Sequence, residues 1–126
     1  MATEILDEYA QFIKRKVVIS KDEGLVIGLD EINPILKDHQ KLIVQWLIRG
    51  GRRACFAAFG LGKSVIQLET VRIVRKHAGG LALIVIPLGV RQEFTRDASM
   101  LGITTKFIRR IEEIEGDSPD VIYLTN

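Results

Sequence analysis

The segment Ala57-Ala58-Phe59-Gly60-Leu61-Gly62-Lys63-Ser64 decides how the rest of the chain is interpreted. It fits the pattern G-x-x-x-x-G-K-[ST], with alanine in place of the first glycine. Gly60 and Gly62 allow the backbone to turn tightly and to approach an anion without an intervening side chain. The amides of such a turn, and of the helix that follows it, point at a phosphate group, and the helix dipole favours the negative charge.

The sequence on both sides of this turn supplies the context that the pattern requires. Residues 54–58 form a short apolar run of the kind found in buried parallel strands. After the turn, apolar residues recur at helical spacing: Val65, Ile66, Leu68, Val71, Ile73 and Val74. We therefore expect a nucleotide site in which Lys63 contacts the β- and γ-phosphates and Ser64 ligates Mg²⁺. The plainer alternative is a glycine-rich turn followed by a solvated lysine.

Hydrophobic periodicity predicts the remaining elements. Helices are expected at 3–14, at 38–48 with Asp38 as its cap, and at 89–100. Strands are expected at 17–19, 25–27, 81–86, 104–108 and 121–124, with a turn at 21–24 and another at 117–119. This alternation predicts an α/β fold with a parallel sheet flanked by helices. A small α+β extension, residues 1–34, is expected to pack beside the domain of residues 35–126.

Composition fits one soluble domain of 126 residues, 47% of them hydrophobic. No apolar run is long enough to span a bilayer, and the acidic N-terminus does not resemble a signal peptide. Cys55 is the only cysteine, which excludes an intramolecular disulfide and suits a reducing cytoplasm. We expect Cys55 and Trp46 to be buried.

Charge is distributed unevenly along the chain. Residues 41–110 carry 13 Lys and Arg but three acids, a net charge of +10, whereas residues 1–40 carry −3 and residues 111–126 carry −5. A basic segment built around a phosphate-binding turn favours a polyanion as a second ligand. The simpler interpretation is a solvated basic face.

Three stretches, in this order, resemble the opening of a superfamily-two helicase. They are Leu36-Lys37-Asp38-His39-Gln40-Lys41, then Phe59-Gly60-Leu61-Gly62-Lys63-Ser64 with Gln67, then Leu83-Ile84-Val85-Ile86-Pro87-Leu88. The resemblance is closest to Swi/Snf-type and phage-encoded DEAD/DEAH-like helicases, and it extends from about residue 32 to residue 126. It implies a partial RecA-like domain, the first of the two motor domains, which binds ATP and Mg²⁺ and moves along nucleic acid, with DNA favoured over RNA.

The resemblance also implies roles for individual residues. Gln40 matches the glutamine that recognises adenine, and Lys63 and Ser64 match the phosphate and magnesium residues. The phosphate-binding set comprises Ala58, Phe59, Gly60, Leu61, Gly62, Lys63 and Ser64. Contacts to the nucleic-acid backbone are expected after two strands, from Pro87 and Leu88 with Arg91 and Gln92 nearby, and from Thr125 and Asn126.

The sequence departs from the helicase pattern at one motif. The family's acidic strand end, Asp-Glu, has no match in this sequence, and no second motor domain is found. We therefore expect a fragment that hydrolyses ATP negligibly by itself and that has an exposed sheet edge through which it self-associates. Two alternatives stay open: a P-loop enzyme of another class, such as a small kinase or a GTPase-like switch, and a non-catalytic interaction module.

Overall fold

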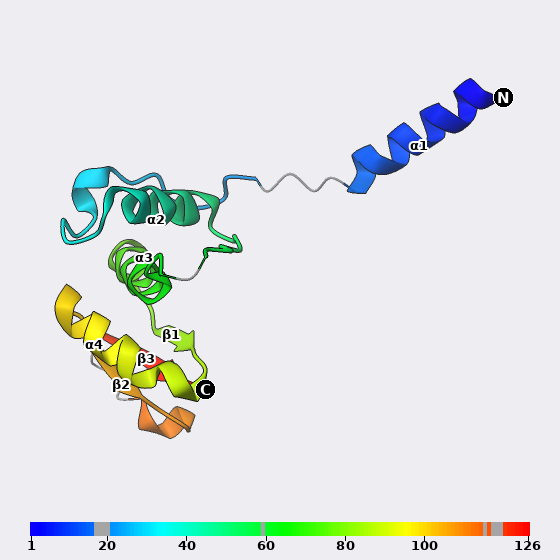
Figure 1. The fold of residues 1–126 in the computed structure, drawn as a ribbon. Coiled ribbons are helices and arrows are strands. Elements are labelled where there is room, and N and C mark those ends of the chain that lie inside the picture. Colours follow the sequence, from blue (N-terminus) through cyan, green and yellow to red (C-terminus); the bar gives the residue numbers. More distant parts are fainter. Residues whose placement is uncertain (17–20, 59, 115, 117–119) are drawn as a thin grey trace.

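The fold is α/β, with a parallel sheet and helices packed against it (Figure 1). The structure, a computed structural model, describes residues 1–16, 21–58, 60–114, 116 and 120–126. The described part has three strands, β1 (Ala82–Val85), β2 (Thr104–Phe107) and β3 (Val121–Thr125), in the order β1-β3-β2. Its four α-helices are α1 (Ala2–Lys16), α2 (Asp38–Gly50), α3 (Lys63–Ala78) and α4 (Arg91–Leu101).

One face of the sheet forms the core with the helices. Ala82 lies opposite Ile122 in the β1–β3 register and Ile84 lies opposite Leu124, so these four buried side chains share one face. They belong to a single apolar cluster with residues of α2, α3 and α4. On the other face of β1, Val85 is 72% exposed. The alternation along β1 therefore directs one set of side chains into the core and the other to the surface.

Glycine ends two of the helices, α3 and α4. Gly79 follows α3 with φ of 71°, and Gly102 follows α4 in the left-handed conformation. Left-handed backbone costs glycine little, because it has no Cβ. At the start of α2 the prediction is off by one residue: Asp38 is the first helical residue and Lys37 is the cap, since the Gln40 side chain accepts a hydrogen bond from the Lys37 backbone amide.

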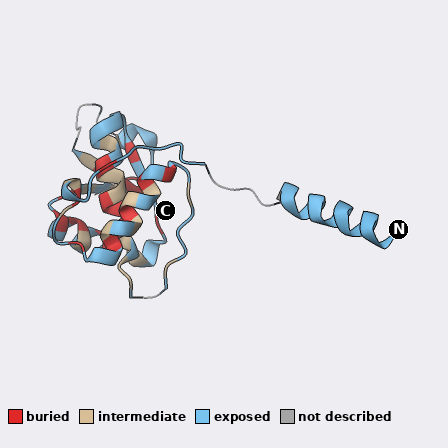
Figure 2. Cartoon of the chain, turned by 90° about the horizontal axis from the view of Figure 1, so that it is seen from above, coloured by how far each residue is buried: buried red, intermediate tan, exposed pale blue. Residues whose placement is uncertain are grey.

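The N-terminal region divides into two parts. All side chains described for α1 are exposed, including the apolar stripe (Ile5, Leu6, Tyr9, Phe12 and Ile13), and the helix lies apart from the rest of the chain (Figure 2). The expectation that this region packs beside the domain is therefore wrong for α1. Helical periodicity predicts which side chains could be buried, but it does not supply the surface that buries them.

The strand expected at 25–27 does not form, and the reason lies in its hydrogen bonds. The amides of Glu23, Gly24 and Leu25 donate to the last carbonyls of α2, at 2.9 to 3.3 Å. This segment therefore satisfies the unpaired C-terminal carbonyls of a helix instead of joining a sheet. The strand expected at 17–19 and the turn at 117–119 lie outside the described residues. In the described part the extension is helical and extended, not α+β.

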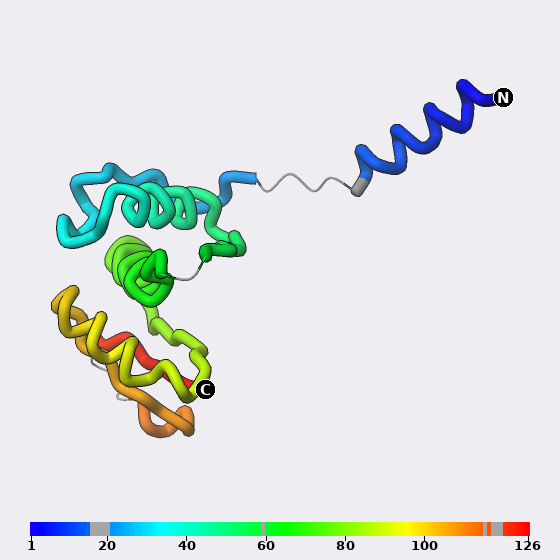
Figure 3. Tube along the Cα trace, in the orientation of Figure 1, coloured from blue at the N-terminus to red at the C-terminus, as the bar shows by residue number. Residues whose placement is uncertain are grey.

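The strand expected at 54–58 is also missing, and this is the main correction to the predicted fold. These residues have neither helical nor strand structure, Cys55 is exposed, and Phe56 is 97% exposed. Three of the five residues are alanines, which have little strand propensity and bury little area in a sheet. Figure 3 shows the chain running through this segment from the end of α2 towards the start of α3.

Trp46 is half-exposed instead of buried. The Arg53 guanidinium carbon lies 4.4 Å from the centroid of its ring, a cation–π contact, and 47% of the residue is accessible. Val44 and Ile48, which flank Trp46 at two residues on either side, are buried apolar positions of α2. Two residues along a helix is more than half a turn, so Trp46 lies on the opposite side.

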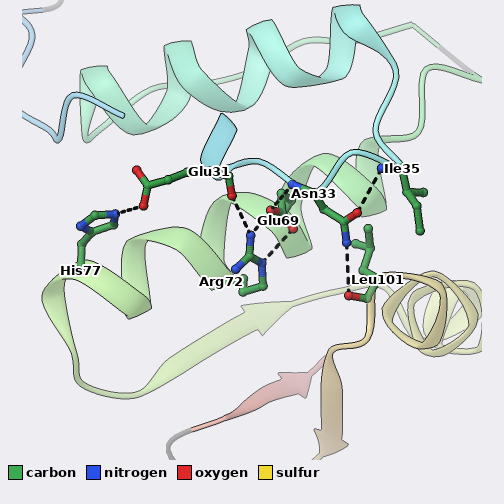
Figure 4. A network of polar contacts seen from close by, with 7 residues as sticks. All are labelled: Glu31, Asn33, Ile35, Glu69, Arg72, His77 and Leu101. Carbon is green, nitrogen blue, oxygen red and sulfur yellow. Dashed lines mark hydrogen bonds and ion pairs between the residues drawn. The ribbon is translucent and has the colours of Figure 1, made fainter. Parts of the chain in front are cut away.

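A buried polar network joins the segment before α2 to α3 and α4 (Figure 4). Glu69, fully buried in α3, accepts hydrogen bonds from the Asn33 amide at 3.1 Å and from Arg72 Nε at 3.0 Å. Arg72 also donates to the Glu31 carbonyl, and Asn33 Nδ2 donates to the Leu101 carbonyl at 3.4 Å. The hydrogen bond to Glu69 raises the pKa of Arg72 above its usual value. The network fixes residues 31–33 against the helical layer.

Candidate functional site

The glycine turn opens into a cavity of about 630 Å³ at the carboxyl end of β1. Its lining comes from three parts of the chain: the turn with the start of α3, the end of β1, and α4. Parallel sheets bind their ligands beyond the carboxyl ends of the strands. Small-molecule sites commonly measure about 300–1,000 Å³, so the cavity has the size of a nucleotide site.

The backbone of the turn has the conformation that the glycines predict. Gly60 has φ of 80° and Gly62 has φ of 73°, both in the range that favours glycine. A Cβ added at Gly60 would meet no atom within 4 Å, so this side of the turn is open. Lys63 is the first residue of α3, and the first helical hydrogen bond runs from the Ile66 amide to the Gly62 carbonyl. The amides of the first turn of a helix have no acceptor within the helix, and this is the feature by which helix N-termini bind anions.

Four of the predicted phosphate-binding residues line the cavity: Gly60, Gly62, Lys63 and Ser64. Gln67 lines it as well. Leu61 belongs to the turn, and Ala58 is exposed just before it. Phe59 lies outside the described residues.

The structure adds two carboxylates that the sequence patterns did not single out. Glu93 and Asp97, four residues apart on α4, line the same cavity. The Ser64 hydroxyl donates a hydrogen bond to the Asp97 carboxylate, and Arg96 lies within 3.7 Å of Asp97 and 3.9 Å of Glu93. Their spacing, one helical turn apart on the helix after β1, is the sequence signal that could have found them.

The donor set fits Mg²⁺ held together with a polyphosphate. Magnesium prefers one or two carboxylates with water and substrate phosphates, rather than a cage of protein ligands. A hydroxyl that donates to Asp97 keeps lone pairs for a cation. Ser64 and Asp97 would hold the ion, and the described residues contain no cluster of three or more His, Cys, Asp or Glu that could do so instead.

Gln40 lies against the turn but is buried, with 7% of its surface exposed. Its Oε1 accepts from the Lys37 amide at 2.9 Å and its Nε2 donates to the Leu61 carbonyl at 3.1 Å. Both ends of the side-chain amide are therefore used within the protein.

The strand-end residues expected to contact nucleic acid lie together at the carboxyl ends of β1 and β3. Val85 and Thr125 are register partners, and the Ile86 amide donates to the Thr125 carbonyl at 2.8 Å. The residues that follow each strand, Pro87 with Leu88 and then Asn126, therefore leave the sheet side by side. Pro87 also lines the cavity, so these strand ends adjoin the candidate phosphate site.

The α4 residues of this set face a second surface. Arg91 and Gln92 line a hollow of about 500 Å³ with Thr95, Arg96 and Ser99. The Arg91 guanidinium carbon lies 4.2 Å from the centroid of the Phe107 ring, which fixes it at the end of β2.

After β2, the backbone amides of Arg109 and Arg110 donate to Glu113 and thereby lower the pKa of that carboxyl.

Comparisons with family models, with curated proteins and with solved structures found no match to this chain. The described helices all fall short of the length and apolar character needed to cross a bilayer.

Proposed function

We propose that this chain is the ATP-binding N-terminal part of an ATP-dependent nucleic-acid helicase or translocase, its first RecA-like domain. One observation carries the proposal: the Gly60–Gly62 turn, Lys63 and Ser64 line one cavity with Pro87 at the end of β1. A phosphate-binding turn beside a strand end is the arrangement from which such a motor couples nucleotide to its track. The basic segment around the turn supports a polyanionic track, with DNA as the first choice.

The residues of the chain divide the work as follows. The turn and the start of α3 bind phosphate through backbone amides, and Lys63 neutralises its charge. Ser64, oriented by Asp97, presents a lone pair to Mg²⁺, which supplies charge neutralisation on the phosphates when bound. Arg91 and the strand-end residues contact the track through its backbone, without sequence preference.

We further propose that the chain alone hydrolyses ATP at background rate. Phosphoryl transfer depends on a positioned water and on neutralisation of the transition state. The sequence offers no match to the acidic strand end that places this water in the helicase pattern. Lys63-dependent phosphate release by the purified chain would overturn this part of the proposal.

The test of nucleotide binding compares two lysines of one helix. Lys63 begins α3, and Lys76 lies near its other end, outside the cavity. Charged hydrogen bonds contribute about 1.5–3 kcal/mol, so Lys63→Ala should weaken Mg²⁺-ATP binding about 10- to 100-fold by calorimetry. Lys76→Ala should leave the Kd within about twofold. Equal effects of both variants would contradict the proposal, and a preference for GTP over ATP would favour a P-loop enzyme of another class.

A further inference from the structure

Gln40 connects α2 to the phosphate turn. It lies in the first turn of α2, yet its Nε2 donates to the carbonyl of Leu61, 21 residues further along the chain. Its Oε1 accepts from the Lys37 amide, which keeps the side chain directed toward the turn. A buried amide with both ends bonded is held in one orientation, because breaking either bond leaves an unsatisfied group.

The contact extends to the next residue of the turn. A Cβ added at Gly62 would lie 2.3 Å from Gln40 Nε2, so the amide group packs directly against the backbone there. At Gly60, which lines the cavity, an added Cβ would meet no atom within 4 Å. Gln40 thus supports the turn at Leu61 and Gly62 and leaves Gly60 open to the cavity.

This support matters because the residues before the turn do not form a strand. Residues 54–58 have no regular structure, and most of them are exposed. A strand hydrogen-bonded within the sheet would fix the start of the turn, and here that restraint is absent among the described residues. The Gln40 hydrogen bond supplies a restraint from α2 instead.

We infer that Gln40 is a positioning residue that holds the phosphate turn in its binding conformation, and that it does not select the base. Reading adenine would require the amide to give up a buried hydrogen bond to Lys37 or Leu61. The inference rests on the proposed function, since it assumes that the turn binds phosphate. It predicts that Gln40 affects every phosphate ligand equally, whether or not the ligand carries a base.

Two substitutions remove the donor in different ways. Gln40→Glu retains the chain length and the acceptor for the Lys37 amide but loses the donor to Leu61. Gln40→Met removes the donor without adding charge, so that repulsion of phosphate cannot explain a shared effect. The matched control is Gln45→Glu on the same helix, where Nε2 donates to the Ile27 carbonyl at 2.9 Å, away from the turn.

The first measurement is the affinity for Mg²⁺-ATP, Mg²⁺-GTP and inorganic tripolyphosphate. Both Gln40 variants should weaken binding of all three by the same factor, about tenfold for one lost hydrogen bond with its acceptor left buried. Gln45→Glu should change none of them by more than about twofold. A loss confined to ATP, with GTP and tripolyphosphate unchanged, would show that Gln40 reads adenine and would overturn the inference.

The second measurement needs no ligand. Amide hydrogen exchange of Ile66, whose amide closes the turn by donating to the Gly62 carbonyl at 3.1 Å, should become at least about tenfold faster in both Gln40 variants, while α3 beyond its first turn keeps its protection. Gln45→Glu should leave the turn unchanged. If the wild-type chain binds none of the three ligands, the proposed function fails, and the exchange result still decides the inference: unchanged exchange at the turn overturns it.

Discussion

Ser64 donates its hydroxyl proton to the Asp97 carboxylate, so the hydroxyl has a protein partner before any metal ion binds. Asp97 is only 15% exposed at its side chain, and Arg96 Nε lies 3.7 Å from its Oδ1, a contact that helps to hold the carboxylate in place. The same hydrogen bond orients the lone pairs of Ser64, because the proton is committed to Asp97. At the residue scale, the site therefore depends on the hydrogen bond between Ser64 and Asp97 of α4, which the phosphate-binding sequence pattern does not include.

Replacing Ser64 with alanine should affect magnesium and leave phosphate binding intact. Without Mg²⁺, in the presence of a chelator, Ser64→Ala should bind ATP within about twofold of wild type, since backbone amides hold the phosphates. The increase in affinity on adding Mg²⁺ should fall about tenfold, since one ligand is lost.

Ser99→Ala, at an exposed serine of α4, is the control. Calorimetry with and without Mg²⁺ measures both quantities. An equal loss under both conditions would assign Ser64 to the phosphate instead of the metal ion.

At the element scale, the sequence predicts the helices and the three strands of the sheet well. Along the strand expected at 81–86, exposed and buried side chains alternate as a strand requires, and β1 covers four of these residues. Prediction from the sequence fails where a short apolar run could pair either with a sheet or with another part of the chain. Residues 54–58 and 25–27 are both short and apolar, but one stays exposed and the other hydrogen-bonds to α2. Periodicity cannot tell which partner a backbone will find.

The candidate site likewise combines residues that a local sequence motif identifies with a residue that only tertiary packing brings in. Gly60, Gly62, Lys63 and Ser64 are local in sequence, and a motif is enough to identify them. Asp97 meets Ser64 only through the packing of α4 on α3, 33 residues away. Its role depends on tertiary structure, which one sequence without an assembled fold does not provide.

The polar network that joins residues 31–33 to α3 should contribute to the stability of the fold. Glu69→Ala should lower the free energy of unfolding by about 3–5 kcal/mol, because Arg72 and the Asn33 amide would be left without their buried partner. The exposed Glu93→Ala should change it by less than about 0.5 kcal/mol. Urea denaturation followed by circular dichroism gives both values.

The pH dependence of the stability that this polar network contributes follows from the raised pKa of Arg72. A raised pKa gives stability that is present below the ordinary arginine value and is lost only as pH rises through the folded value. The Arg72 contribution should therefore be constant from neutral to moderately alkaline pH. A loss of the Glu69→Ala effect within the neutral range would contradict this assignment.

At the scale of the whole molecule, the cavity beside the glycine turn lies at the carboxyl ends of the strands. Pro87 belongs to both, and β3 brings Thr125 beside the end of β1. β1 and β2 each pair with β3 alone among the described strands, so both have an outer edge, and self-association through such an edge stays a prediction.

Nucleic-acid binding at the carboxyl ends of the strands should depend steeply on salt concentration. If about four phosphates of a single strand are contacted, affinity should fall roughly 50-fold between about 50 and 200 mM salt. Arg91→Ala should flatten the slope of log affinity against log salt by about 0.7, and Arg15→Ala in the detached α1 should not change it. Fluorescence anisotropy with a labelled oligonucleotide measures the slope. An affinity independent of salt concentration would contradict the proposal that the chain binds a polyanion through phosphate contacts.

The most direct test of the central claim is to map the binding of Mg²⁺-ATP by the amide shifts of the chain in solution. A second cavity, of about 620 Å³, is lined by Arg72, Arg75 and Lys76, and it offers phosphate a purely electrostatic alternative near the other end of α3. If the glycine turn binds the phosphates, the largest shifts should occur at residues 60–65 and at Val85 and Ile86, with the second cavity unaffected. Shifts concentrated at residues 72–76, with the glycine turn unchanged, would contradict it.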